Sequence, residues 1–232
     1  MNGRLGAGIL VAAPLGDEAR GTLGSWGRPY RAVERGRNLN TTDAGSCAFF
    51  LVSGWAARYL MLPDGSRKIV GILLPGDPIN LHSWRVSKLD HAVLALTDAQ
   101  VAVVPRERVE HACDALADLR SALSAASVKE LAILRKWYSL AGRTPALKAV
   151  AHLLCELDHR QRQLGVEEGR ITFPIKQEEI ADALGLTAVH VNRTLKELRE
   201  MGLAKGARPL TISDRAGLMK TAKFDPAYLE PN

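Results

Sequence analysis

The stretch PIKQEEIADALGLTAVHVNRTLKELREMGLA, residues 174–204, decides the C-terminal fold of this 232-residue chain. Gly185 provides a tight turn in its middle, and Thr187 is a residue type that caps helix N-termini. Two short helices joined by a turn that contains glycine predict a helix-turn-helix over residues 177–199. The apolar residues that recur at helical spacing on either side of the turn are Ile180, Ala181 and Leu184, then Val191, Leu195 and Leu198.

The outward residues of the second helix define the surface that DNA would meet. Arg193 is the best candidate for direct base readout, because a guanidinium can bond guanine O6 and N7 together. Asn192 can reach adenine or a phosphate, whereas Ala188 and Val189 offer only apolar contact, for example to a thymine methyl. The DNA-binding candidates of this segment are Lys176, Gln177, Thr187, Ala188, Val189, His190, Asn192, Arg193 and Lys196. Among them Lys176, Gln177, Thr187 and Lys196 are expected to contact phosphates.

Residues 203–213 predict a two-stranded wing after the second helix. Short apolar runs flank the turn residues Gly206, Ala207, Arg208 and Pro209. Lys205 and Arg208, at the tip, suit backbone phosphates. Residues 214–229 predict a short helix that packs back on the same domain.

Upstream, residues 28–105 carry the signals of strands rather than helices. Asp64 and Gly65 suit a hairpin turn between two of the runs, because glycine adopts positive φ at little cost. The pattern predicts a compact β-unit. The short apolar runs are 47–54, 57–61, 68–74, 92–96 and 100–104.

After Pro105 the apolar period becomes helical, which predicts one long helix over about residues 115–140. Such a helix is longer than a small domain needs for its own packing, so a dimer seam is expected along it. A connecting helix packed only within its own subunit is the alternative. The predicted dimerisation residues are Leu116, Leu119, Leu123, Ala126, Leu134 and Trp137. The chain thus divides into residues 1–114, 115–142 and 143–232.

The bulk properties agree with a DNA-binding protein. The formal net charge of +6 and pI near 9.4 are compatible with a polyanionic partner, but the basic excess is not concentrated in the proposed DNA-binding segment. The cysteines Cys47, Cys113 and Cys155 lie too far apart for a zinc knuckle, and they fit reduced thiols in the cytoplasm. No apolar run reaches the length of a membrane span. No metal-binding cluster, catalytic triad order or phosphate-binding glycine loop is evident, so we expect no enzyme.

This order of parts resembles the Crp/Fnr family of bacterial transcription regulators. The resemblance covers roughly residues 28–229. It is carried by FFLVSGWAARYLMLPDGSRKIVGILLPGD at 49–77, AHLLCEL at 151–157 and KQEEIADALGLTAVHVNRTLKELREMGL at 176–203. It implies an α+β protein with an N-terminal, jelly-roll-like β-roll of the cyclic-nucleotide-binding type, a dimerisation helix and a C-terminal winged helix-turn-helix. It also implies contact with RNA polymerase.

The chain departs from the family at the effector site. Members that bind cyclic AMP hold its phosphate with Gly-Glu and Arg-Ser pairs. The matching stretches here read Gly76-Asp77 and Leu89-Asp90-His91, which argues against cyclic AMP because Asp90 would repel the phosphate. No cysteine cluster precedes Cys47, which argues against an iron–sulfur centre. The effector-site candidates are Gly76, Asp77, His82, Asp90 and His91.

His82 leaves a haem hypothesis open. Residues 76–83 are similar to the haem-ligating stretch of the carbon monoxide-sensing branch, with His82 at the axial position and Asn80 where that branch has a ligating cysteine. A structural histidine is the favoured interpretation. We therefore expect a homodimeric regulator of a roughly palindromic operator, controlled by an unidentified effector or active whenever expressed. The alternatives are a haem-based gas or redox sensor, and a ligand-binding module whose helix-turn-helix contacts proteins.

Overall fold

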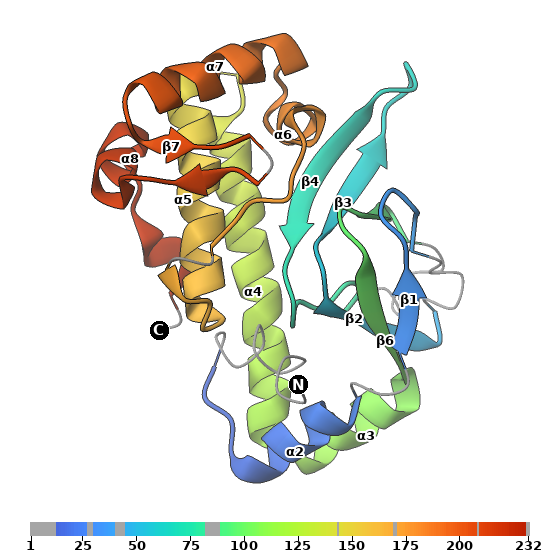
Figure 1. The fold of residues 1–232 in the computed structure, drawn as a ribbon. Coiled ribbons are helices and arrows are strands. Elements are labelled where there is room, and N and C mark those ends of the chain that lie inside the picture. The colour runs from blue at the N-terminus through green and yellow to red at the C-terminus, as the bar shows by residue number, and fades with distance from the viewer. Residues whose placement is uncertain are drawn as a thin grey trace. The chain divides into compact units, whose positions relative to one another are not determined.

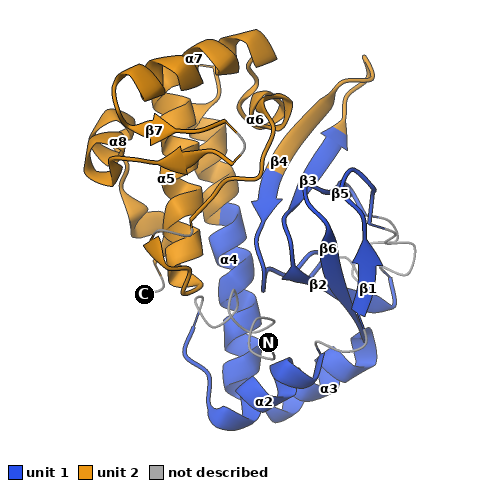
Figure 2. Ribbon diagram, in the orientation of Figure 1, with its two compact units in different colours: residues 1–60, 71–131, 231–232 blue, residues 61–70, 132–230 orange. Residues whose placement is uncertain are grey.

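The computed structural model describes residues 13–26, 30–39, 45–81, 89–142, 144–168, 171–207 and 209–230. The chain forms two compact units (Figure 2). The first comprises Met1–Leu60, Gly71–Leu131 and Pro231–Asn232, and the second comprises Met61–Val70 and Ala132–Glu230. The boundary between these units lies inside the long helix, between Leu131 and Ala132, whereas the sequence pattern divides the chain at the two ends of that helix.

Two three-stranded sheets form the predicted β-roll (Figure 1). One has the order β1-β6-β2 with antiparallel pairing, and the other has the order β4-β3-β5. Each apolar run that predicted a strand is one, within one or two residues at its ends. The strands are β1 Tyr30–Val33, β2 Cys47–Ser53, β3 Ala56–Met61, β4 Arg67–Leu73, β5 Ala92–Ala95 and β6 Ala99–Pro105.

Strand β2 is buried on both faces, which explains its unbroken apolar sequence. Phe49 and Leu51 enter the core between the two sheets, together with Val93 of β5 and Val101 of β6. Successive strand residues point to opposite faces, so Phe50 enters a second core on the other side of the sheet. A strand buried on one face only would have alternated apolar and polar residues.

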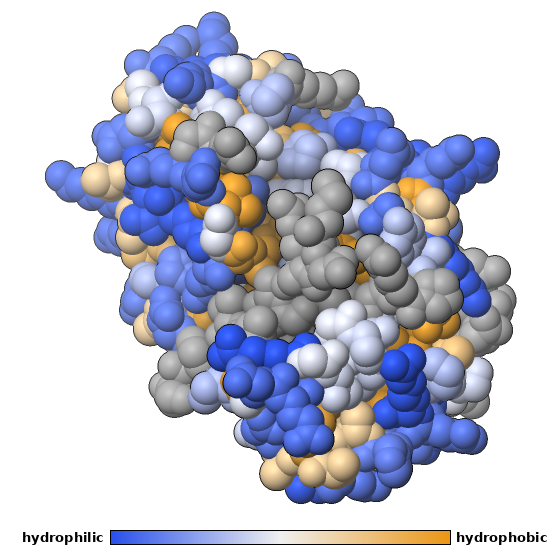
Figure 3. Space-filling view, turned by 60° about the horizontal axis from the view of Figure 1, so that its bottom comes forward, coloured by the Kyte–Doolittle hydropathy of each residue, from blue (hydrophilic) through white to orange (hydrophobic). Residues whose placement is uncertain are grey.

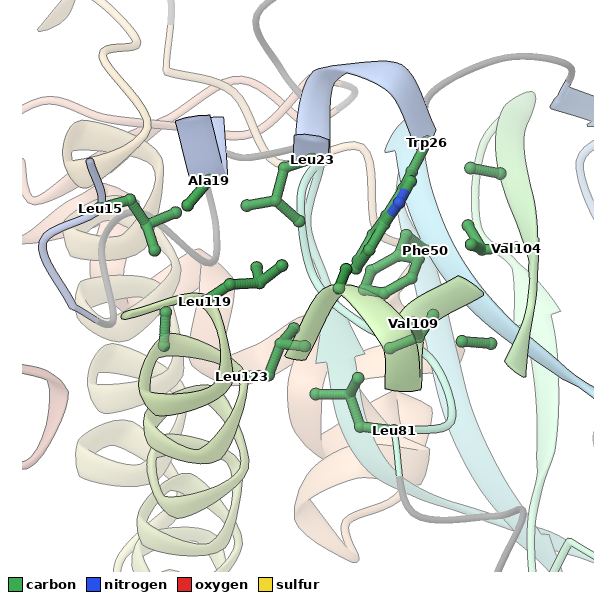
Figure 4. Packing of buried hydrophobic residues seen from close by; sticks show 14 residues of the cluster. Leu15, Ala19, Leu23, Trp26, Phe50, Leu81, Val104, Val109, Leu119 and Leu123 are labelled. Carbon is green, nitrogen blue, oxygen red and sulfur yellow. The ribbon is translucent and has the colours of Figure 1, made fainter. Parts of the chain in front are cut away.

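Helices α2 Asp17–Trp26, α3 Arg106–Ala115 and the start of α4 Ala117–Leu140 build this second core (Figure 4). Trp26 of α2 lies against Phe50, with ring centroids 5.6 Å apart. Leu119 and Leu123 of α4 point into the same cluster and are 0% and 7% exposed. The sequence pattern did not predict α2 or α3, because no long apolar period marks them.

The predicted dimer seam needs correction. Leu119, Leu123 and Trp137 are buried within their own chain, and Leu116 and Ala126 are partly buried against the second core. Leu119 has no accessible surface, and Leu123 and Trp137 are only 7% and 6% exposed, so the inward face of α4 packs mainly within its own chain. Of the six predicted residues, Leu134 alone belongs to the large exposed apolar residues of α4, which are Val128, Leu131, Leu134 and Tyr138.

The second unit contains the predicted helix-turn-helix, wing and C-terminal helix (Figure 1). Helix α5 forms its centre and packs against α7 and α8. No helix in the described part of the chain has the length and apolarity to span a membrane. The elements are α5 Ala146–Gln163, α6 Gln177–Leu184, α7 Ala188–Glu200, β7 Ala204–Lys205, β8 Thr211–Ile212, α8 Arg215–Ala222 and the 3-10 helix η3 Pro226–Leu229.

Two buried carboxylates of α5 fasten this unit together. Asp158, which is 2% exposed, accepts hydrogen bonds from Arg162 Nε at 2.9 Å and from Arg215 Nε of α8 at 2.8 Å. Glu156, which is fully buried, accepts from Trp137 Nε1 at 3.0 Å and from the Tyr228 hydroxyl at 2.8 Å. Because a buried charge is costly unless it is paired, these contacts fix α8 and η3 on α5.

The second unit also includes the turn between β3 and β4, residues 61–70. Within this unit Arg67 Nη2 lies 2.8 Å from the Asp182 carboxylate of α6, and Lys68 Nζ donates to the Ala183 carbonyl at 2.9 Å. Burial lowers the pKa of Lys68, while Asp182 acts in the opposite direction. The sequence pattern did not indicate these contacts, since they join residues about 115 positions apart.

Candidate nucleic-acid interface

Helix α6 begins and ends as its sequence predicts. At its start the Glu179 carboxylate accepts a hydrogen bond from the Lys176 backbone N–H at 2.6 Å, which satisfies one of the free donors of the first turn. At its end Gly185 has φ of 68°, a left-handed conformation that other residues adopt at a cost. The turn therefore depends on glycine at this position.

Helix α7 is held rigidly by its cap and its buried face. The Thr187 hydroxyl accepts from the His190 backbone N–H at 3.2 Å and so closes the N-terminus, as predicted. Val191, Leu195 and Leu198 are at most 4% exposed, and Thr194 between them is also buried. The inward face of α7 is thus fully used in packing, which leaves the opposite face for a ligand.

A stripe of four exposed residues runs along that opposite face, namely Val189, Asn192, Arg193 and Lys196. At 100° per residue, these side chains fall within a sector about 100° wide. Val189 is 80% exposed, which is high for an apolar residue. We call these four residues the recognition stripe.

The other candidates of the segment border the recognition stripe. Ala188 and His190 are half-buried on its two sides, and Thr187 is exposed at its N-terminal end. Lys176 and Gln177 are half-buried at the start of α6. At the C-terminal end of the stripe, Lys196 Nζ lies 3.6 Å from the Glu200 carboxylate, with both side chains exposed. An exposed pair of this kind is weak, so it leaves Lys196 able to turn to a phosphate.

The wing follows as predicted, with one contact that the sequence did not reveal. Lys205 is exposed on β7, whereas Arg208 lies outside the described residues. Arg199, near the end of α7, donates from Nη1 to the Gly206 carbonyl at 3.1 Å. Gly206 has φ of 73°, and a Cβ there would lie 2.5 Å from the Pro209 carbonyl oxygen. Arg199 therefore fixes the wing turn to the recognition helix.

Four of the five predicted effector residues, Gly76, Asp77, Asp90 and His91, lie in the described part of the first unit. Gly76 forms a turn with φ of 93°, and the Asp77 carboxylate accepts from the Leu74 backbone N–H at 2.7 Å. Asp90 is exposed, and its carboxylate lies 2.7 Å from His91 Nδ1. These carboxylates would repel a cyclic phosphate, so the residues at these positions do not fit a cyclic nucleotide.

The haem hypothesis is not tested by the geometry. His82 lies outside the described residues. Asn80, at the position of the ligating cysteine, is 4% exposed and serves the fold: its side chain accepts from the Phe49 N–H at 2.7 Å and donates to the Cys47 carbonyl at 2.9 Å. Across the described ranges, no group of three or more His, Cys, Asp or Glu residues is arranged to hold a metal ion.

Comparisons with known proteins agree with both halves of the chain. A family model described as "Crp-like helix-turn-helix domain" matches residues 148–221. A second family model, "Cyclic nucleotide-binding domain", matches residues 39–115. The second match spans strands β2 to β6 and helix α3.

Similar proteins are transcription regulators. The chain is 30% identical over 203 residues to the transcriptional activator protein FnrL of Cereibacter sphaeroides, covering 84% of this chain and 81% of the relative. It is 32% identical over 163 residues to the nitrogen fixation regulation protein FixK of Bradyrhizobium diazoefficiens, covering 69% and 67%. Among solved structures, FixK2 from Bradyrhizobium japonicum superposes with a TM-score of 0.73 at 28% identity, covering 83% and 96%. The chain therefore belongs to the Crp/Fnr family and is a DNA-binding transcription regulator that acts as a homodimer.

Proposed function

We propose that each protomer inserts α7 into the major groove at one half-site of a roughly palindromic operator. The main support for this proposal is the recognition stripe, because its side chains are exposed on a helix whose opposite face is buried. Arg193 reads guanine O6 and N7, Asn192 reads adenine or bonds a phosphate, and Val189 packs on a thymine methyl. Two such helices read one operator when they lie one turn of DNA apart, about 34–36 Å.

Residues around the stripe position the protein on the backbone. Lys176, Gln177 and Lys196 offer polar or cationic groups at the edges of α6 and α7. The Thr187 oxygen accepts the cap hydrogen bond, which leaves its O–H free to donate to a phosphate. Lys205 on the wing contacts the phosphate backbone as well, and so does Arg208, three positions later in the sequence. These contacts supply salt-dependent affinity and no base preference.

We assign the dimer contact to the exposed face of α4. Val128, Leu131, Leu134 and Tyr138 are 43–83% exposed and lie three or four residues apart. That spacing places them on one stripe, which a second copy of the same helix can cover as in a coiled coil. We call these residues the α4 apolar stripe. It replaces the seam predicted from the sequence, of which it keeps Leu134.

The regulator acts in the cytoplasm, where its DNA is, and it contacts RNA polymerase as other family members do. It binds its operator without cyclic AMP, since the positions that would hold the nucleotide carry Asp77 and Asp90. We assign it no catalytic activity. Haem bound through His82 is the second candidate function, and it would make the protein a gas or redox sensor that still binds DNA.

One experiment tests these assignments together. The purified protein, without added ligand, selects sites from a random double-stranded DNA pool at physiological salt, and its absorption spectrum is recorded on the same sample. We expect a palindromic consensus with half-sites one helical turn apart and no Soret band. A Soret band would establish the haem sensor instead. Binding without any consensus and with weak salt dependence would favour a helix-turn-helix that contacts proteins.

A further inference from the structure

A buried arginine in the β-roll joins three separate parts of the first unit. Arg58 lies on β3 and is 7% exposed. Its Nε donates to the Ile79 carbonyl at 3.2 Å, its Nη2 donates to the Pro78 carbonyl at 2.6 Å, and its Nη1 lies 2.9 Å from the Glu130 carboxylate of α4. Each of the three guanidinium nitrogens thus has a different partner. A guanidinium in this position is stable only because all of these partners are present.

The two carbonyls belong to residues 76–81, the segment that begins with the effector candidates Gly76 and Asp77. This segment is already fastened to β2: the Ile79 N–H donates to the Phe49 carbonyl at 2.8 Å, and the Asn80 side chain bonds both Phe49 and Cys47. Arg58 adds the connection from this segment to α4. A displacement of Pro78 or Ile79 therefore acts directly on the group that holds Glu130.

Glu130 lies on α4 between two residues of the α4 apolar stripe, Val128 and Leu131. Its carboxylate side chain is 47% exposed, while its partner guanidinium is 9% exposed. The ion pair holds the middle of α4 on the β-roll next to the boundary between the two units, which follows Leu131. The stripe is consequently presented from a helix that is anchored at its midpoint.

We propose that the Glu130 carboxylate takes the place of an anionic effector of the β-roll. By pairing with Arg58 it holds α4 on the β-roll, so that α4 can dimerise without a diffusible effector. An anchored helix loses less conformational freedom when its partner binds, so the pair favours the dimer. The proposal rests on the α4 apolar stripe being the dimer face. It assigns a coupling role to two residues that lie outside both the recognition stripe and the α4 apolar stripe.

The test compares two glutamates of similar exposure, each paired with an arginine, in the full-length protein. Glu130→Gln removes the charge and keeps the shape of the side chain. Glu110→Gln is the matched control, because Glu110 is 45% exposed and pairs with Arg106 at 2.7 Å on α3. Sedimentation measures the dimer dissociation constant, and hydrogen exchange measures the protection of the Ile79 and Asn80 amides in dilute samples. Circular dichroism checks that each variant is folded.

We expect Glu130→Gln to raise the dimer dissociation constant at least about fivefold and to speed exchange at residues 79 and 80, with Glu110→Gln unchanged. Glu130→Asp, which keeps the charge, should recover part of both effects. If Glu130→Gln dimerises like the control, or if exchange at residues 79 and 80 does not change, the proposal is overturned. A dimer that survives Leu131→Glu would instead refute the proposed dimer face, so the two failures are distinguishable.

Discussion

At the scale of single residues, burial separates the side chains that build the fold from those that are available to DNA. Thr194 and Arg193 are neighbours in the sequence, yet Thr194 is 3% exposed and Arg193 is exposed. Asn80 occupies the position of the ligating cysteine in the stretch that resembles a haem site. Both ends of its amide bond the backbone of β2 instead.

Replacement of Arg193 by alanine should weaken binding to the selected operator by about 1–3 kcal/mol and relax the preference at one base pair in each half-site. The loss is expected because a bidentate contact to guanine would be removed from an exposed position. Binding to operator variants, each changed at one base pair, measures both effects. Arg37→Ala is the control, since Arg37 is an exposed cation of the first unit. An Arg193 variant that ranks all operators as the wild type does would make Arg193 an ordinary surface residue.

At the scale of elements, α4 has two apolar faces with different uses. Its inward face, with Leu119 and Leu123, completes the core around Trp26 and Phe50. Its outward face carries the α4 apolar stripe. The face of the molecule drawn in Figure 3 combines hydrophilic residues with small apolar patches, so exposed apolar residues alone do not identify an interface. Their regular spacing on one helix provides the argument.

Leu131→Glu should therefore give folded monomers. Leu131 is 44% exposed, so the fold tolerates a charge there, but in the dimer the two glutamates of the partner helices would repel each other. Leu119→Ala tests the inward face: it should lower the free energy of unfolding by about 2–5 kcal/mol and leave the dimer contact intact. Sedimentation and chemical denaturation measure the two quantities. A dimer that survives Leu131→Glu would place the interface on another element.

Two glycines in helical surroundings should respond to alanine in opposite ways. Gly185 has φ of 68°, so Gly185→Ala should lower the free energy of unfolding by about 1 kcal/mol and disturb the turn of the helix-turn-helix. Gly21 lies inside α2, and a Cβ there would meet no atom within 4 Å. Gly21→Ala should raise the free energy of unfolding by about 0.5–1 kcal/mol. Denaturant titration measures both, and equal effects would contradict the assigned turn geometry.

At the scale of the whole molecule, the chain consists of two compact units. The first unit holds the β-roll and the segment tied by Arg58. The second holds the recognition stripe, and its C-terminal end is tied to α5 through Glu156, Tyr228 and His152. The Tyr228 hydroxyl donates to Glu156, so it accepts from His152 Nε2, and this requires the histidine to carry its proton there.

His152 should make the unfolding free energy depend on pH. Burial, with smaller effects of Lys136 and Lys148, lowers its pKa to about 4 from the usual value of 6.5. The unfolded chain therefore binds more protons than the folded chain between these values, and this part of the stability is lost as pH falls from about 6.5 to 4. Denaturation of the wild type and His152→Gln across this range checks the effect: the difference in stability between them should shrink at lower pH. A constant difference would show that His152 is not buried in its neutral form.

The sequence by itself determined the elements and the family. Apolar spacing located the strands, the helix-turn-helix and the wing, because each of these patterns is local and follows from the period of the backbone. Exposed positions on α7 followed for the same reason, since Val191, Leu195 and Leu198 defined the inward side of that helix. Gly185 and Thr187 marked the turn and the cap through their own conformational chemistry.

Only the tertiary structure decided which face of α4 is free and what Arg58 binds. A helix with apolar residues on two sides does not reveal from its period which side packs on its own chain, because that depends on α2 and β2, far away in the sequence. The contacts of Arg58 with Pro78 and Glu130 likewise join segments that only the folded chain brings together. Local periodicity carries no information about such partners, whereas burial and distance identify them directly.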